Sequence, residues 1–288
     1  EMNIDVEKTK TKVEELKKQD KLPKIAMFGG SVFLFPHPVK ELADFLKSYD
    51  MHINYDAAHV AGLIAGDKFQ DPLREGVDTM TMSTHKTLFG PQGGLVLAFE
   101  KNAEAIKKAT FPGLTSSHHI HHMAAKAVTF AEALEFGKDY ASQTIKNAKA
   151  LAVALNDLGF KVLGEKKGFT QSHQTVVNVL DYGDGGKIES DLEKANIIVN
   201  RQLIPGDLKA KRHYMHPGGI RLGTSEVTRL GMKEQEMEQI ASFIKNVVVD
   251  NKDTKDTAKQ IAEFRKKYQK TQYCFDNNLG AYEYVKLR

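Results

Sequence analysis

The sequence has very little cysteine and no long hydrophobic run. Its single cysteine, Cys274, cannot form a disulfide within the chain or a zinc cluster of several cysteines. No segment approaches the roughly 20 consecutive apolar residues of a membrane-spanning helix, and the first residues are charged, unlike those of a signal peptide. We therefore expect a cytoplasmic protein in a reducing compartment, without a membrane partner.

The excess of positive charge is small and lies in one segment. The formal net charge is +4, and residues 251–271 hold seven Lys or Arg against three Asp or Glu, which alone gives this excess. A lysine-rich helical segment of this kind is usually a solvated face. We therefore expect no nucleic-acid partner.

The first part of the chain has the pattern of an alternating α/β sheet. With 288 residues and 41% hydrophobic residues, the chain can bury one large core or two smaller ones. Short apolar runs predict strands at Ile25–Gly29, His52–Tyr55, Thr79–Met82 and Gly94–Phe99. The last run is continuously apolar, which is typical of a strand buried on both faces. Helical spacing predicts helices at 5–24, Pro38–Tyr49 and Asn102–Ala109.

The pattern changes after Phe111-Pro112-Gly113. Two long helical patterns follow, at His118–Gly137 and Ala141–Leu158. The remainder predicts a modest α+β unit, with strands at Thr175–Leu180 and Ile197–Asn200 and helices at Lys187–Ala195 and Lys233–Val248.

Polar clusters follow three of the predicted strands, where the loops of an open α/β sheet form a ligand crevice. The clusters are Ser31, Asp56–His59 and Ser83–Lys86. Lys86 stands beside Ser83, Thr84 and His85 and is followed by a glycine-rich turn, which predicts partial burial. Burial lowers the pKa of an amine, and a neutral amine can attack an aldehyde to form a Schiff base. Lys86 is therefore a candidate for holding an aldehyde cofactor.

Asp56 can supply the carboxylate that keeps the ring nitrogen of a pyridinium cofactor protonated. The alternative is a helix N-cap, because Ala57-Ala58-His59 could open a helical turn. His59 could reach the same ligand, or it could be a core histidine. Arg221 lies in a glycine-rich segment and could bind a substrate carboxylate in a fork, or it could pair with Glu226.

A histidine cluster raises the possibility of a zinc site. Helical spacing puts His118, His121 and His122 on one face, with His119 beside them. No carboxylate or thiol accompanies them nearby, so we expect a cofactor-lining helix start or an interface, and no metal.

Four segments together resemble serine hydroxymethyltransferase, a fold-type I enzyme that uses pyridoxal 5'-phosphate (PLP). They are residues 56–63 (Asp-Ala-Ala-His-Val-Ala-Gly-Leu), 84–91 (Thr-His-Lys-Thr-Leu-Phe-Gly-Pro), 111–113 and 219–224. The resemblance implies that residues 1–117 are the carboxyl-terminal part of the PLP-binding large domain. Residues 118–138 would then be a connecting helix, and 139–288 a small α+β domain with a helical tail.

The resemblance also implies roles for individual residues. Lys86 would bond to the cofactor, Asp56 would pair with the pyridine nitrogen, His59 would contact the phenolic oxygen, and Arg221 would bind the substrate α-carboxylate. Lys86, His59 and His85 are the expected catalytic residues. The other polar supports would be Ser31 and Ser83 around the cofactor, with Thr87 behind Lys86.

The family moves a one-carbon unit between serine and a tetrahydropterin, leaving glycine, and usually forms a homodimer. Gln202 stands where the family has a pterin-contacting Asn, so the carrier could be tetrahydrofolate or tetrahydromethanopterin. The His-His-x-His-His string resembles a divergent, archaeal-looking branch.

In the family, the part that would precede Glu1 supplies the phosphate cradle. We therefore expect the chain alone to be incomplete or to need a complementing amino-terminal chain. Two alternatives stay open. One is a PLP-dependent threonine or allo-threonine aldolase, which needs no pterin. The other is a non-catalytic subunit that acts through the family's dimer surface.

Overall fold

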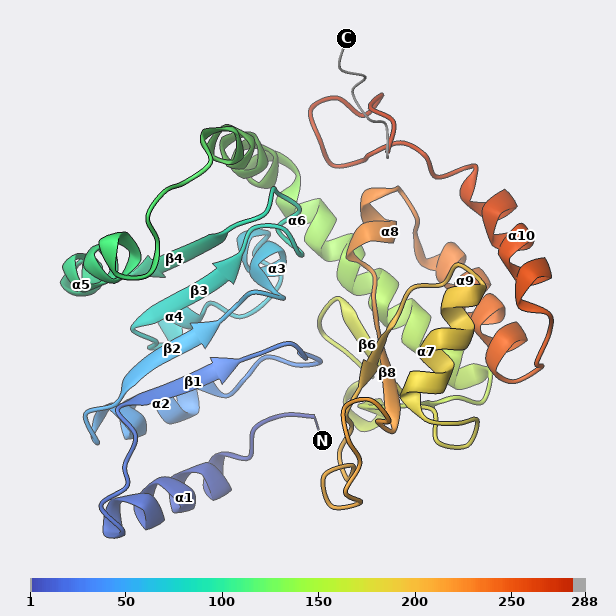
Figure 1. The fold of residues 1–288 in the computed structure, drawn as a ribbon. Coiled ribbons are helices and arrows are strands. Elements are labelled where there is room, and N and C mark those ends of the chain that lie inside the picture. The colour runs from blue at the N-terminus through green and yellow to red at the C-terminus, as the bar shows by residue number, and fades with distance from the viewer. Residues whose placement is uncertain (1, 282–288) are drawn as a thin grey trace. The chain divides into compact units, whose positions relative to one another are not determined.

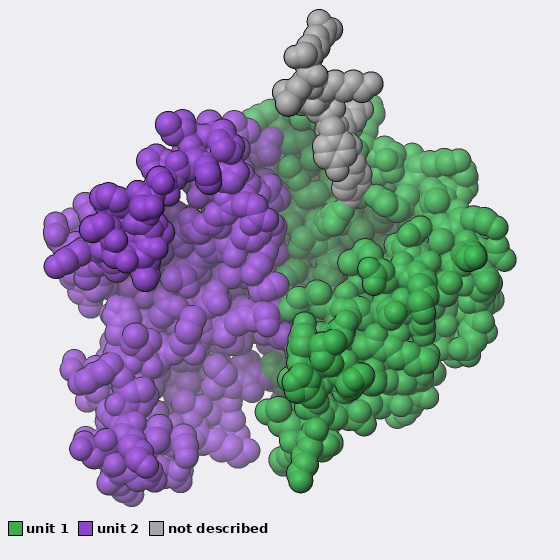
Figure 2. Space-filling view, in the orientation of Figure 1, with its two compact units in different colours: residues 1–2, 139–288 green, residues 3–138 purple. Residues whose placement is uncertain are grey.

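The computed structural model describes residues 2–281, which form two compact units. One unit comprises residues 3–138, and the other comprises the described residues from Asp139 onward together with Met2 (Figure 2). Each unit contains a four-stranded sheet (Figure 1).

The sheet of the first unit is mostly parallel. Its strands are β1 (Ile25–Gly29), β2 (His52–Asp56), β3 (Thr79–Ser83) and β4 (Gly94–Ala98), in that order across the sheet. β1, β2 and β3 run parallel, and β4 is antiparallel to β3. All four strands lie where the sequence predicts them.

Helices pack on this sheet because their apolar residues recur on one face. In α2 (Val39–Lys47), Val39, Leu42 and Leu46 are fully or almost fully buried. The other helices of the unit are α1 (Val6–Lys18), α3 (Ala61–Ala65), α4 (Pro72–Glu75), the 3-10 turn η1 (Glu100–Asn102), α5 (Ala103–Lys108) and the irregular turn η2 (Ala109–Leu114).

β4 is not buried on both faces, so that expectation from the sequence is wrong. Val96 is 41% exposed and Leu97 40% exposed. The reason is position in the sheet: β4 is the last strand in the order, and among the described residues only β3 pairs with it. A continuous apolar run therefore forms an edge strand here.

A single helix, α6 (Ile120–Asp157, 38 residues), replaces the two helices predicted from the sequence. The expected connecting helix at 118–138 does not end there. Gly137 continues the helix and packs close to Gly66, while Tyr140 is fully buried beside the ring of Tyr273. Because Tyr140 gains burial by staying helical, the chain has no break at this point.

The second unit has an antiparallel sheet in the order β5 (Lys161–Val162), β6 (Gln174–Asn178), β8 (Gly219–Gly223) and β7 (Asn200–Gln202). The strand expected at Ile197–Asn200 is misplaced, because β7 begins only at Asn200 and Ile198, which is 78% exposed, lies in the irregular segment before it.

Helices cover this second sheet and complete an α+β unit. Its core includes Ile188, Leu192, Ile220, Met237 and Ile244. The helices are α7 (Gly185–Lys194), α8 (Ser225–Arg229), α9 (Glu234–Val248) and α10 (Thr254–Arg265), with a 3-10 turn η3 (Glu165–Lys167). Across the described residues, no helix has the length and apolar character needed to cross a membrane.

Candidate active site

Three parallel strands end side by side at one edge of the first sheet (Figure 1). The strand register pairs Gly29 with Asp56, and Asp56 with Thr81. The ends of these three strands and the segments that follow them carry six of the seven predicted site residues: Ser31, Asp56, His59, Ser83, His85 and Lys86. The sheet therefore gathers the predicted polar clusters at its carboxyl edge, as expected for a ligand crevice.

Asp56 is the last residue of β2 and is partly buried. One of its carboxylate oxygens, Oδ1, accepts a hydrogen bond from the backbone N–H of Ala58 at 3.0 Å. This bond fixes the carboxylate in a local turn. The alternative interpretation as a helix N-cap is wrong, because the next helix, α3, has Val60 at that position.

His59 lies in the turn between β2 and α3 and is partly buried. The segment after this turn is anchored by Gly62, whose backbone N–H donates to Thr87 Oγ1 at 3.0 Å. A Cβ at Gly62 would overlap the backbone carbonyl of Thr87. The segment of His59 and the segment of Lys86 are thus in direct backbone contact.

The loop that carries Lys86 is closed by hydrogen bonds around Thr84. The Thr84 N–H donates to Gly93 O at 3.0 Å, its Oγ1 donates to Pro91 O at 2.7 Å, and Gly90 N–H donates to Thr84 O at 2.7 Å. His85 Nδ1 accepts from Gly93 N–H at 3.4 Å. These bonds give a fixed base for the lysine.

Lys86 itself is exposed, so the expected partial burial is wrong for the described chain. The buried positions of this loop belong to Thr84, Thr87 and Leu88. The glycines after Lys86 shape the loop and do not enclose the amine.

A partly buried histidine, which the sequence analysis did not identify, supports the β1 end of the site. His37 Nδ1 accepts a hydrogen bond from the backbone N–H of Gly29 at 3.2 Å. Its ring stacks on Phe33 with 4.6 Å between centroids. Burial lowers the pKa of His37 to about 4, so the ring is neutral and can accept this bond. Ser31, two residues after Gly29, is exposed.

Arg221 belongs to β8 of the second unit, and its side chain is partly buried. Burial lowers its pKa from the usual value. Its Nη2 donates to Asn200 Oδ1 at 2.9 Å. The sequence alone does not predict this partner, because Asn200 and Arg221 meet only through the pairing of β7 with β8.

In the histidine cluster, His118, His119 and His121 are exposed and His122 is partly buried. The ring centroids of His119, His121 and His122 lie 4.5 to 5.4 Å apart. Within residues 2–281, no three His, Cys, Asp or Glu side chains are arranged to hold a metal ion.

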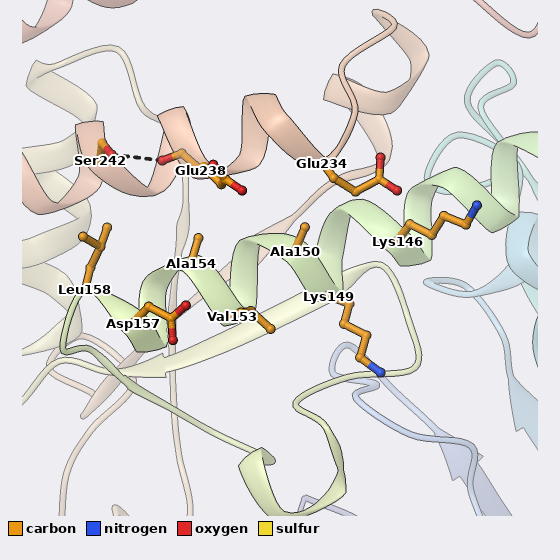
Figure 3. A pocket seen from close by; sticks show the side chains of 10 residues that line it. All are labelled: Lys146, Lys149, Ala150, Val153, Ala154, Asp157, Leu158, Glu234, Glu238 and Ser242. Atoms are coloured by element: carbon orange, nitrogen blue, oxygen red, sulfur yellow. Dashed lines mark hydrogen bonds between the residues drawn. The ribbon is translucent and has the colours of Figure 1, made fainter.

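The second unit has a hollow between α6 and α9. It has a volume of about 530 Å³, and Figure 3 shows Ala150 and Ala154 of α6 pointing toward α9, which carries Glu234 and Glu238. None of the predicted site residues lines it. Lysines and glutamates at an open groove are typical of a solvated helix pair, and we assign it no ligand.

The residues at the sheet edge fit the ring end of PLP. They offer a carboxylate (Asp56), an imidazole (His59) and an exposed amine (Lys86), the donor set that a pyridinium aldehyde requires. Backbone also packs closely there: a Cβ at Gly29 would overlap the carbonyl of Asp56. Such packing holds the backbone of Asp56 in place.

Comparison with known proteins gives a consistent result. A family model described as serine hydroxymethyltransferase matches residues 1–244. A serine hydroxymethyltransferase of Nitrosopumilus maritimus (strain SCM1) is 78% identical over 288 residues, covering all of this chain and 66% of the relative. One of Cenarchaeum symbiosum (strain A) is 71% identical over 287 residues, covering 100% of this chain and 65% of the relative. The chain thus spans about two thirds of the length of these relatives.

A solved structure has the same fold. The crystal structure of L-threonine transaldolase from Pseudomonas fluorescens, in its internal aldimine state, matches with a TM-score of 0.84 and 33% sequence identity. The match covers 96% of this chain and 61% of that chain. It confirms the predicted fold class, a fold-type I α/β unit with a mostly parallel sheet followed by a smaller α+β unit.

Proposed function

Because the chain belongs to the serine hydroxymethyltransferase family, we propose that it contributes the cofactor-binding lysine to the active site of a PLP enzyme that interconverts serine and glycine. The observation that carries the proposal is the convergence of Asp56, His59 and Lys86 at one sheet edge. The matching family model and the archaeal relatives support the same reaction.

Each residue has a distinct task in this proposal. Lys86 holds the cofactor by its aldehyde, Asp56 holds the protonated ring nitrogen, and His59 contacts the phenolic oxygen. When bound, PLP withdraws electrons from the substrate α-carbon, which is what breaking the Cα–Cβ bond of serine requires. Arg221 binds the substrate α-carboxylate through charge-assisted hydrogen bonds.

Four neighbours would support these groups. Ser31 and Ser83 are polar contacts to the cofactor, and His85 is a polar catalytic support beside Lys86. Thr87, which follows Lys86, stabilises the backbone of this loop by accepting a hydrogen bond from the N–H of Gly62. The loop bonds of Thr84 would keep Lys86 in a constant position.

The one-carbon carrier is a tetrahydropterin, either tetrahydrofolate or tetrahydromethanopterin. We also propose a cytoplasmic homodimer. Exposed apolar side chains support the dimer, because Phe111, Leu114, Ile120 and Leu134 are each more than 60% exposed, and a second copy could cover them.

A second candidate is aldol cleavage of threonine or allo-threonine without a pterin. The structural similarity to an L-threonine transaldolase favours it. The two reactions share the cofactor and the bond that breaks, so they differ in the acceptor of the released carbon unit.

One experiment separates these reactions. The natural gene product, supplied with PLP, is assayed for glycine from serine with each tetrahydropterin, and for acetaldehyde from allo-threonine without pterin. We expect pterin-dependent glycine formation that is lost in Lys86→Ala. Faster pterin-independent cleavage would favour the aldolase, and no activity in either assay would support the non-catalytic alternative.

A further inference from the structure

We infer that Asn200 is a positioning residue that orients Arg221 for a substrate carboxylate, and that its neutral amide preserves the positive charge which the carboxylate needs. This inference rests on the proposed function, in which Arg221 binds the α-carboxylate of serine or glycine.

The backbone brings the two side chains together. β7 and β8 are antiparallel, and their register places Asn200 directly opposite Arg221. Residues in such a pair project from the same face of the sheet. Asn200 Oδ1 accepts from Arg221 Nη2 at 2.9 Å. This bond uses one of the five N–H donors of the guanidinium and restrains its orientation.

β7 is itself anchored, so Asn200 has a fixed position. The next residue, Arg201, projects to the opposite face because side chains alternate along a strand. Its backbone N–H donates to Glu189 Oε1 at 3.2 Å, and its guanidinium forms an ion pair with the same carboxylate. Glu189 belongs to α7. The strand that presents Asn200 is therefore fastened to a helix by a charged pair.

The chemical identity of residue 200 matters because Arg221 is partly buried. A partly desolvated cation needs a hydrogen-bond acceptor. A carboxylate at position 200 would satisfy this need but would neutralise the guanidinium and compete with the substrate carboxylate. An amide accepts the bond without placing a negative charge beside Arg221.

The test uses Asn200→Asp, which keeps the shape and the acceptor and changes only the charge. Serine and ethanolamine, which lacks the carboxylate, are each titrated into the PLP-loaded natural gene product. We expect the Kd of serine to rise about tenfold or more. The new carboxylate would compete with the carboxylate of serine for Arg221, and the loss of a hydrogen bond to a charged group weakens binding by about this factor. The Kd of ethanolamine and the melting temperature should stay close to those of the wild type.

Two further variants serve as controls. Asn196→Asp introduces the same charge at an exposed position four residues earlier, and it should leave the preference for serine over ethanolamine unchanged. Asn200→Ala removes the acceptor without adding charge and should weaken serine binding less than Asn200→Asp does. A purely structural role for Asn200 predicts the opposite order, because Asp retains the hydrogen bond and Ala does not.

Arg221→Ala distinguishes a failure of this inference from a failure of the proposed function. If Arg221→Ala loses the preference for serine but Asn200→Asp keeps it, the role of Asn200 is refuted and the proposed function stands. If Arg221→Ala also keeps the preference, the carboxylate-binding role of Arg221 is wrong, and the inference about Asn200 falls with it.

Discussion

Thr87 and Gly62 join the two halves of the candidate site through a backbone contact. The N–H of Gly62 donates to Thr87 Oγ1 at 3.0 Å, and the Gly62 Cα lies so close to the Thr87 carbonyl that no side chain fits between them. Thr87 follows Lys86, and Gly62 lies three residues after His59. The distance between the lysine and the Asp56 segment is therefore set by packing as well as by strand pairing.

Substitution of Gly62 by Ala should destabilise the protein. The new Cβ would overlap the Thr87 carbonyl, and backbone cannot rotate away as a side chain can. We expect the free energy of unfolding to fall by about 3 kcal/mol, measured by urea denaturation. Gly94→Ala is the matched control, because its Cβ would meet its nearest neighbour at an ordinary 3.6 Å. Equal losses in the two variants would contradict the tight contact.

The hydroxyl of Thr87 should also be needed for stability. Thr87→Val keeps the shape but leaves the buried N–H of Gly62 without this acceptor, which costs about 1 to 3 kcal/mol in unfolding free energy. Thr87→Ser retains the acceptor and should lose less. If Val proves as stable as Ser in urea denaturation, the hydrogen bond does not hold the site together.

The stability of the first unit should depend on pH through His37. Burial lowers its folded-state pKa to about 4, below the value of 6.5 expected when unfolded. Between these two values the unfolded state binds a proton that the folded state does not. The contribution of His37 to the free energy of unfolding should therefore be constant above about pH 6.5. It should fall as the pH drops towards 4, by at most about 3 kcal/mol.

His37→Asn is the comparison for this pH dependence. An Asn oxygen can accept the bond from the Gly29 N–H but does not titrate in this range. Urea denaturation between about pH 4 and 7 should show a shallower slope in the variant. Parallel profiles for the two proteins would show that folding does not lower the pKa of His37.

The sequence predicted the strands and the polar clusters of the first unit well, for a physical reason. Alternating apolar runs specify β1, β2 and β3, and parallel strands place their carboxyl ends at one edge. The approach of the Asp56 and Lys86 segments follows from that topology. Their proposed roles in binding PLP stay predictions.

The errors concern properties that local patterns do not encode. A glycine at 137 suggested a helix end, but burial of Tyr140 keeps α6 continuous. The apolar run of β4 suggested full burial, which depends on its neighbours across the sheet. The contacts of Asn200 with Arg221, His37 with Gly29, and Gly62 with Thr87 join residues that are 21, 8 and 25 positions apart. A single sequence gives no signal for them.

The identity of the lysine that holds PLP is the central claim, and one measurement tests it most directly. The natural gene product is loaded with PLP, reduced with borohydride and digested, and the modified peptide is sequenced by mass spectrometry. We predict that the cofactor is attached to Lys86, that Lys86→Ala carries none, and that Lys126→Ala, a change near the same loop, remains fully labelled. Attachment to another lysine, or undiminished labelling of Lys86→Ala, would contradict the account.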